Sequence, residues 1–224
     1  MRPPFDPTLY LVTDTELSRP RPVADVVRAA VAGGVTAVQV RDKFASRRDL
    51  LELVRAVQCA VADTPGVRVV VNDALDVALL AGADGVHVGQ DDLPAAEVRA
   101  LIGPDRLLGL SVSSRAELDA ALALPTGTLD LVGLGPVWGT PTKPDAGPAL
   151  GPAGVAELAS AARARRLAAV AIGGISHDRA AEVAATGVDG ICVVSAVCTA
   201  ADPAAAARKL RDEVTRGRSA VKAR

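Results

Sequence analysis

The sequence predicts a single α/β domain folded as a closed (β/α)8 barrel, the TIM barrel. Eight short apolar runs alternate with eight Ala- and Leu-rich amphipathic segments along 224 residues, which is the pattern of successive βα units. The apolar runs are nearly continuous, as in parallel strands that are covered by helices. Three similar segments, AGGVTAVQV, AGADGVHVG and ATGVDGICV, each lead from a glycine just after a predicted helix into a predicted strand. An open doubly wound sheet is the main alternative.

The strands are predicted where short β-branched runs stand between turn-forming residues. In chain order they are TLYLVT (8–13), TAVQVR (36–41), VRVVVN (67–72), DGVHVG (84–89), RLLGLS (106–111), LDLVGLG (129–135), LAAVAIGG (167–174) and DGICVVS (189–195). The amphipathic segments that follow them are predicted as helices near 22–33, 46–63, 73–82, 93–102, 114–123, 152–165, 176–186 and 202–216. The domain is expected to span 1–224, with a mildly basic, frayed and solvated tail from about 217.

The composition restricts the class of protein. Half of the residues are hydrophobic but only 2% are aromatic, so the core must consist of Ala, Val and Leu. The net charge of −1, without runs of like charge, argues against nucleic acids and membrane surfaces as partners. No stretch reaches the ~18 apolar residues of a membrane span, and the start MRPPFDPTLY lacks the apolar region of a secretory signal. Cys59, Cys192 and Cys198 show no CxxC spacing, so we expect reduced, buried thiols in a cytoplasmic protein.

Cations follow the second predicted strand, at the end where TIM barrels carry their functional residues. In VQVRDK, strand alternation places Gln39, Arg41 and Lys43 on one face and Val38 and Val40 on the other. The two valines suit the helix-covered side, so the polar residues should point to the barrel axis or its mouth. The two cations predict an anion-binding site, and ion-paired cations at a barrel rim are the structural alternative.

Carboxylates follow the next two predicted strands. Asn72 and Asp73 come after the third strand, and Asp91 and Asp92 come after the fourth. Each could cap the next helix. Beside the two cations, however, they predict a Mg²⁺–phosphate site, because Mg²⁺ usually takes one or two carboxylates together with substrate phosphates. The chain has only two histidines, so no zinc cluster is predicted.

The later strand ends predict a second anion site. Ser111 ends the fifth strand and either donates a hydrogen bond into the mouth or caps the next helix. The glycines before Ser176 and the short turn at Ser195 follow strands seven and eight, whose loops often bind phosphate in these barrels. Tight helix–strand packing is the alternative for these glycines. The stretch GLGPVWGTPTKPDAGPALG (133–151) is predicted to be a functional loop, anchored through the packing of Trp138.

Taken in order, six motifs resemble those of the thiamine phosphate synthase family: VQVRDK, VNDALDVALLAGADGVHVGQDDLP, LGLSVSS, DLVGLGPVWGTPTKPDAGPALG, AIGGI and GICVVSAV. The resemblance covers nearly the whole chain, and VGLGPVWGTPTK together with GVHVGQDD is its most specific part. It implies a Mg²⁺-dependent transferase. That enzyme joins 4-amino-2-methyl-5-hydroxymethylpyrimidine diphosphate to 4-methyl-5-(2-hydroxyethyl)thiazole phosphate and releases pyrophosphate. The expected partners are these small molecules, and the sequence leaves open whether the chain forms a homo-oligomer.

The resemblance also implies roles for individual residues. The pyrimidine diphosphate would contact Gln39, Val40, Arg41, Asp42, Lys43, Asn72, Ser111 and Lys143. The thiazole phosphate would contact Thr140, Pro141, Thr142, Gly174, Val194 and Ser195. Mg²⁺ would be held by Asp73 and Asp92, and the catalytic side chains would be Lys143, Arg41, Lys43 and Ser111. A thiazole tautomerase of similar fold and a non-enzymatic phosphate sensor are the alternative functions.

Overall fold

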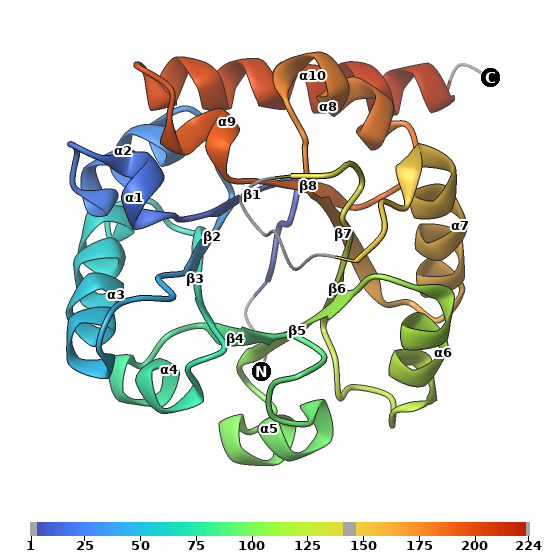
Figure 1. The fold of residues 1–224 in the computed structure, drawn as a ribbon, viewed down its shortest axis with the longest axis horizontal. Helices are drawn as coiled ribbons and strands as arrows, with labels where there is room; N and C mark the ends of the chain where they lie inside the picture. The colour runs from blue at the N-terminus through green and yellow to red at the C-terminus, as the bar shows by residue number, and fades with distance from the viewer. Residues whose placement is uncertain (1–3, 141–146, 223–224) are drawn as a thin grey trace.

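The computed structural model describes residues 4–140 and 147–222. Eight parallel strands close into a barrel in chain order, with β8 paired to β1 (Figure 1). The strands are β1 (Leu9–Val12), β2 (Ala37–Val40), β3 (Arg68–Asn72), β4 (Gly85–Val88), β5 (Leu107–Val112), β6 (Leu131–Leu134), β7 (Ala168–Ile172) and β8 (Gly190–Val193). This order confirms the predicted barrel and excludes the open sheet.

Helices surround the strands on the outer side (Figure 1). They are α1 (Thr15–Ser18), α2 (Val23–Ala32), α3 (Arg47–Val61), α4 (Leu75–Ala81), α5 (Ala95–Ile102), α6 (Arg115–Ala123), α7 (Gly151–Ala164), α8 (His177–Ala184), α9 (Ser195–Cys198) and α10 (Pro203–Lys222). The eight predicted helices correspond to α2–α8 and α10, while α1 and α9 are single turns. Ser114 caps α6, since its Oγ accepts from the backbone N–H of Glu117 at 3.2 Å.

Strand alternation separates two apolar cores. Leu9 and Leu11 of β1 pack in the layer between strands and helices, whereas Tyr10 and Val12 lie in a smaller core inside the barrel. The other buried members of the inner core are Ala37, Leu131, Val170 and Cys192. Phe5 packs against this core through an edge contact with Tyr10, with ring centroids 6.0 Å apart. The interior is therefore filled with side chains, and a ligand site must lie at its mouth.

The segment predicted as a tail from about 217 is helical instead, because α10 continues to Lys222. Gly217 is buried, and a Cβ there would lie only 2.2 Å from the carbonyl oxygen of Ala181 in α8. Arg218 donates to the backbone carbonyl of Asp189 and, at 3.3 Å, to Thr8 Oγ1. The basic composition of this segment predicted a solvated tail. Its close contact with α8 instead stabilises the helix, which continues to Lys222.

One expectation about the thiols is also wrong. All three cysteines are free, and Cys192 and Cys198 are buried, but Cys59 is exposed. The buried face of α3 carries Val54 and Val57, and position 59 falls on the outer face of the same helix.

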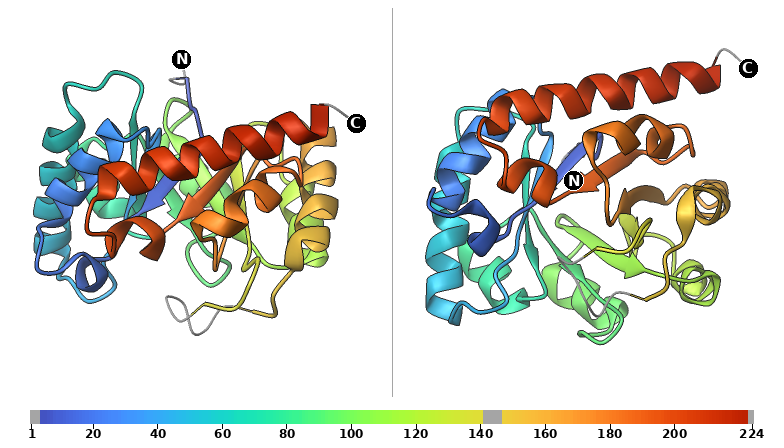
Figure 2. Two further views of the ribbon diagram at one scale, coloured as in Figure 1. Left: turned by 90° about the horizontal axis from the view of Figure 1, so that it is seen from above. Right: turned by 45° about the horizontal axis from the view of Figure 1, so that its top comes forward.

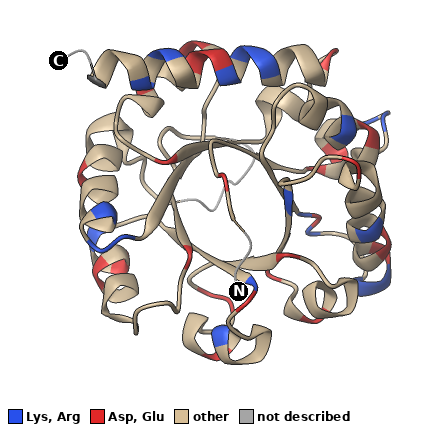
Figure 3. Cartoon of the chain, turned by 180° about the vertical axis from the view of Figure 1, so that it is seen from behind, with Lys and Arg blue, Asp and Glu red and all other residues tan. Residues whose placement is uncertain are grey.

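The two ends of the barrel differ in what covers them. The described parts of the β6–α7 loop lie at one end, and the segment before β1 lies at the other (Figure 2). Both signs of charge are interspersed over the outer helices (Figure 3). Among the described residues, no helix is both long and apolar enough to cross a membrane.

Candidate active site at the carboxyl ends of the strands

The end of β2 holds Gln39 and Arg41 in place. Gln39 is buried inside the barrel, where its Nε2 lies 3.5 Å from the hydroxyl of Tyr10. The backbone N–H of Arg41 donates to Thr13 Oγ1 at 3.0 Å, and that hydroxyl lies 3.3 Å from the Arg41 carbonyl oxygen. The guanidinium of Arg41 is 4.0 Å from the carboxylate of Asp14, which is the outer limit of an ion pair. Val40 points away into the outer core, as alternation predicted, so its side chain does not face the barrel interior.

The carboxylate of Asp42 organises the β2–α3 loop. It accepts hydrogen bonds from Thr15 Oγ1 at 2.7 Å and from the backbone N–H groups of Phe44 and Ala45 at 2.9 and 3.0 Å. Partial burial raises the pKa of Asp42, but these three hydrogen bonds outweigh it and hold the pKa below its ordinary value of 3.8. The side chain is therefore engaged in supporting the loop that carries Arg41 and Lys43.

We expect Asp42→Ala to lower the free energy of unfolding by about 1 kcal/mol in urea titrations, because three donors at a partly exposed loop lose their acceptor. Asp42→Asn keeps an acceptor oxygen and should cost less. Since the folded pKa is lowered, the stabilisation is present above the ordinary pKa and is lost as the pH falls through the folded pKa. The gap between Asp42→Asn and the unsubstituted protein should therefore close on acidification. A loss of diphosphate affinity in Asp42→Asn at full stability would instead make this carboxylate a ligand contact.

Asp73 and Asp92 meet at the mouth, although they follow different strands. Burial and a hydrogen bond shared with the carboxylate of Asp92 raise the pKa of Asp73 to about 6, while Asn72 and Lys43 oppose the rise. Asn72 Nδ2 donates to Asp73 Oδ2 at 2.5 Å, and the backbone N–H of Gly89 donates to Asp92 Oδ2 at 2.7 Å. Two carboxylates held this close, with a lysine beside them, form a strongly polar pair.

The capping alternative fails for both carboxylates. Ala74 is the N-cap of α4 and Pro94 is the N-cap of α5, and neither helix has a side-chain cap. Asp73 also has a backbone φ of +57°, a left-handed conformation that is uncommon outside glycine. Its position is therefore held by the surrounding structure rather than by local preference, as is frequent at functional sites.

The donor set at this pair fits Mg²⁺. Asp73, Asp92 and Asn72 offer oxygen atoms, which this hard cation prefers. Within 4–140 and 147–222, no group of three or more His, Cys, Asp and Glu side chains is placed to hold a metal. The protein would then supply two carboxylates, and substrate phosphates and water would complete the coordination, which is the usual arrangement for Mg²⁺.

Ser111 is tied to His87, a link that the sequence analysis missed. His87 is buried in β4, and its Nε2 lies 3.0 Å from Ser111 Oγ in β5. A Cβ on Gly109 would lie 2.3 Å from His87 Nδ1, so only glycine there makes room for the ring. A glycine inside an apolar strand marks such a close approach, and this was the available signal. Ser111 does not cap α6, since Ser114 does.

The glycine pair after β7, Gly173 and Gly174, contacts the loop that follows β6. Gly174 has a φ of +66°, and a Cβ there would lie 2.9 Å from Trp138 Cβ. Ser176 is the N-cap of α8 but makes no side-chain cap bond. Val194 and Ser195 begin α9, which confirms the predicted turn after β8.

The stem of the β6–α7 loop is fixed on both sides. Val137 N–H donates to the Ile172 carbonyl at 2.9 Å, and Leu150 N–H donates to the Pro136 carbonyl at 2.8 Å. Trp138 packs against the main core, as expected for an anchor. Thr140 is the last described residue before the gap. The predicted ligand residues Pro141, Thr142 and Lys143 lie outside the described residues.

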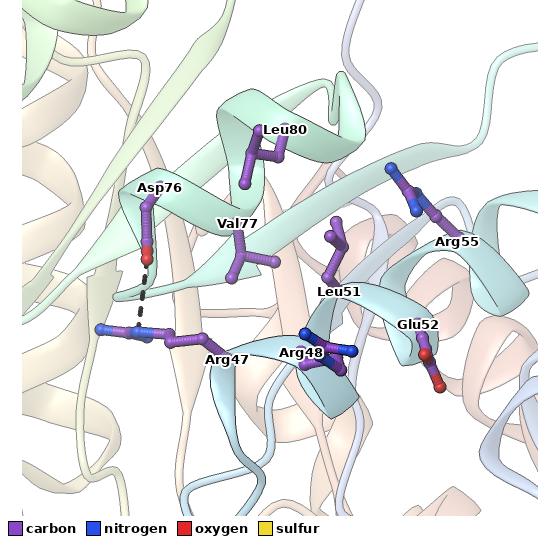
Figure 4. Close-up of a pocket in the computed structure, with 8 residues that line it drawn as sticks. All are labelled: Arg47, Arg48, Leu51, Glu52, Arg55, Asp76, Val77 and Leu80. Carbon is purple, nitrogen blue, oxygen red and sulfur yellow. Dashed lines mark ion pairs between the residues drawn. The ribbon is translucent and has the colours of Figure 1, made fainter.

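A groove of about 370 Å³ lies elsewhere, between α3 and α4 on the outer layer (Figure 4). Leu51, Val77 and Leu80 line it, and Arg47 pairs with Asp76 across it at 3.5 Å. It contains none of the predicted site residues.

The fold and the residues at the mouth of the barrel define a class of protein. It is a (β/α)8-barrel protein with a carboxylate pair and cations at the carboxyl ends of its strands. The family described as thiamine monophosphate synthase matches residues 9–197, so the chain belongs to the thiamine monophosphate synthase family. Its members are transferases of thiamine biosynthesis, and the chain is an enzyme of that kind.

Individual relatives agree with this assignment. The chain is 50% identical over 218 residues to a thiamine-phosphate synthase of Solidesulfovibrio magneticus, covering 97% of this chain and all of that protein. It is 45% identical over 215 residues to a thiamine-phosphate synthase of Moorella thermoacetica, covering 94% and 97% of the two chains. A solved structure, thiamine phosphate pyrophosphorylase from Pyrococcus furiosus, superimposes with a TM-score of 0.83 at 36% identity, covering 95% of this chain and 98% of that one.

Proposed function

We propose that this protein joins 4-amino-2-methyl-5-hydroxymethylpyrimidine diphosphate to 4-methyl-5-(2-hydroxyethyl)thiazole phosphate, forming thiamine phosphate and pyrophosphate. The observation that carries the proposal is the meeting of Asp73 and Asp92 beside Lys43, at the mouth of a barrel of this family. A tautomerase acting on the thiazole phosphate alone would have no use for this carboxylate pair.

The proposed reaction is a substitution by dissociation. The bond between the pyrimidine methylene carbon and the diphosphate oxygen breaks, and its electron pair leaves with the diphosphate. The electron-rich aminopyrimidine stabilises the resulting cation, and the ring nitrogen of the thiazole donates its lone pair to form the new C–N bond. No protein nucleophile is required. The chain must instead stabilise the leaving group and align the two substrates.

Stabilisation of the leaving diphosphate is assigned to Arg41, Lys43 and Ser111. Arg41 and Lys43 stand on the loop that Asp42 supports, and Ser111 is oriented by His87. Lys143 is proposed as a further partner of the diphosphate, from the sequence motif alone. A Mg²⁺ ion held by Asp73 and Asp92 would neutralise diphosphate charge. Gln39, whose amide is fixed against Tyr10 inside the barrel, would contact the pyrimidine.

The second task, positioning the thiazole phosphate, is assigned to the loops after β6, β7 and β8. Gly174 and Ser195 would offer backbone N–H groups to the monophosphate, without a metal. Thr140 and Thr142 would complete this contact. The glycine supports the assignment, because φ of +66° favours glycine at position 174 and the missing side chain permits close approach of a ligand to the backbone.

We expect Gly174→Ala to weaken binding of the thiazole phosphate about tenfold or more, because a side chain at this φ is strained and would meet Trp138. Affinity for the pyrimidine diphosphate should not change. Isothermal titration with each substrate separates the two effects. Gly82→Ala is the matched control, because Gly82 has a φ of +60° but nothing within 4 Å of an added Cβ. Unchanged thiazole phosphate affinity in Gly174→Ala would contradict the assignment.

The activity is tested by incubating the protein with both substrates and Mg²⁺. Thiamine phosphate and pyrophosphate should accumulate in equal amounts, and omission of either substrate should stop both. Isomerisation of the thiazole phosphate without the pyrimidine diphosphate would indicate the tautomerase instead. Tight binding of both substrates without product would indicate a sensor. We also propose the cytoplasm as the compartment, on the basis of three free cysteines.

A further inference from the structure

The glycine pair after β7 is held by two residues that are not among the predicted ligand contacts. The guanidinium of Arg179, on the first turn of α8, lies over the ring of Trp138, with Cζ 4.7 Å from the ring centroid. The same guanidinium donates through Nη1 to the carbonyl oxygen of Gly174 at 3.1 Å. The backbone N–H of Trp138 donates to the carbonyl oxygen of Gly173, also at 3.1 Å. Trp138 and Arg179 therefore hold two consecutive carbonyl groups.

Fixing these carbonyls also fixes the next two N–H groups. In a trans peptide the C=O of one residue and the N–H of the following residue point in opposite directions. The bond to the Gly173 carbonyl therefore turns the Gly174 N–H away from Trp138. In the same way, the bond to the Gly174 carbonyl turns the Ile175 N–H away from Arg179. No hydrogen bond within 4–140 and 147–222 uses either N–H as its donor, so both are available to a ligand.

Two features indicate that the orientation of the Gly174 carbonyl depends on the stack of Arg179 on Trp138. Both glycines have positive φ, +105° at Gly173 and +66° at Gly174, and such a backbone does not hold its orientation through steric preference alone. Arg179 is an exposed side chain, yet it reaches back five residues to the glycine carbonyl and stacks on an aromatic ring from another loop. Its contacts thus bridge the β6–α7 loop and the loop after β7.

We propose that Arg179 and Trp138 are positioning residues for the thiazole phosphate, and this rests on the proposed function. They aim the N–H groups of Gly174 and Ile175 at the monophosphate, and Arg179 does not itself contact the ligand. The contact between Arg179 and Trp138 also joins the loop after β7 to the stem of the β6–α7 loop, which carries Thr140. Loss of either side chain should loosen the peptide between Gly174 and Ile175, so their effects should overlap; the bond to the Gly173 carbonyl comes from the backbone N–H of Trp138 and is kept in side-chain variants.

The test measures the affinity for each substrate in variants. Arg179→Ala should raise the Kd of the thiazole phosphate about tenfold, the scale of one hydrogen bond from a charged donor, and leave the Kd of the pyrimidine diphosphate unchanged. Trp138→Leu should have the same selective effect, while Trp138→Phe, which keeps an aromatic face, should be near normal. The double variant Arg179→Ala/Trp138→Leu should be little weaker than either single variant. Arg115→Ala is the control, since Arg115 is an exposed arginine on α6 that pairs with Asp119 and Glu157.

Different outcomes separate this inference from the proposed function. Normal thiazole phosphate affinity in Arg179→Ala, with an active unsubstituted protein, overturns the inference alone. Additive losses in the double variant, together with a loss in Arg179→Ala that shrinks as KCl is raised, would mean that Arg179 contacts the phosphate directly, and this also overturns it. An unsubstituted protein that forms no thiamine phosphate overturns the proposed function. Circular dichroism confirms that each variant is folded, and Arg179→Lys, expected between Arg179→Ala and the unsubstituted protein, provides a milder change.

Discussion

Asp73→Ala and Asp92→Ala are each expected to remove nearly all thiamine phosphate formation while the barrel stays folded. The reason for the loss is that the two carboxylates are the proposed ligands of Mg²⁺, and two ligands cannot be reduced to one without weakening the site. The fold should survive because neither side chain caps a helix. Each loses one local hydrogen bond, from Asn72 or from Gly89, which is worth about 1 kcal/mol.

The raised pKa of Asp73 predicts how these substitutions affect the stability of the folded protein. A carboxyl whose folded pKa is raised from 3.8 to about 6 loses stability as the pH rises between these two values, and above 6 the folded state bears the full cost of a partly buried charge repelled by a second carboxylate. Near pH 7, removal of one partner relieves this repulsion. We therefore expect the melting temperature of Asp92→Ala to be unchanged or slightly higher, in contrast to Asp42→Ala.

The measurement is pyrophosphate release as a function of Mg²⁺ concentration, with circular dichroism on the same samples. Asp91→Ala is the matched control, because Asp91 is the adjacent exposed carboxylate and is not a proposed ligand. Full activity in excess chelator, or in the double alanine variant, would rule out the assignment of a metal to this pair.

The barrel could be predicted from sequence because its signal is repeated. Each strand is a continuous apolar run and each helix is amphipathic, so the repeating pattern is recognised even where the bounds of one unit are misplaced. The side of each residue also followed from alternation: Val38 and Val40 lie in the outer core, while Gln39 lies inside. These are local properties of the chain.

The contacts between strand ends could not be predicted in the same way, because they depend on how the barrel closes. The sequence placed Asp73 and Asp92 on neighbouring strand ends but could not separate a ligand pair from two helix caps. Asp42 was predicted to contact the ligand because it lies within the motif VQVRDK, yet its carboxylate accepts hydrogen bonds from its own loop and from Thr15. The link between His87 and Ser111 requires β4 and β5 to be in register, with His87 opposite Gly109.

Lys143→Ala is expected to reduce kcat about 10²–10³-fold, which is the usual cost of losing one preorganised partner of a developing negative charge. Lys143 is the one cation between Gly133 and Gly151, and the stem of this loop is fixed against β7 through Val137 and Trp138. Its proposed partner is the diphosphate as it departs. An interaction made mainly in the transition state affects kcat more than ground-state affinity. The Kd of the thiazole phosphate should therefore stay nearly unchanged in this variant.

Neighbouring substitutions test whether the lysine is assigned to the correct phosphate. Thr140→Ala and Thr142→Ala should weaken thiazole phosphate binding with a smaller effect on kcat, the reverse of Lys143→Ala. Lys209→Ala, on the exposed side of α10, controls for the loss of a lysine charge and should be normal. Single-turnover kinetics with both substrates saturating report the chemical step directly.

Near-normal turnover in Lys143→Ala would make this lysine a solvated loop residue. Retained kcat with lost thiazole phosphate binding would instead assign the lysine to the monophosphate. Only a loss confined to the chemical step assigns the lysine to the leaving diphosphate, because that is the group whose charge grows as the C–O bond breaks.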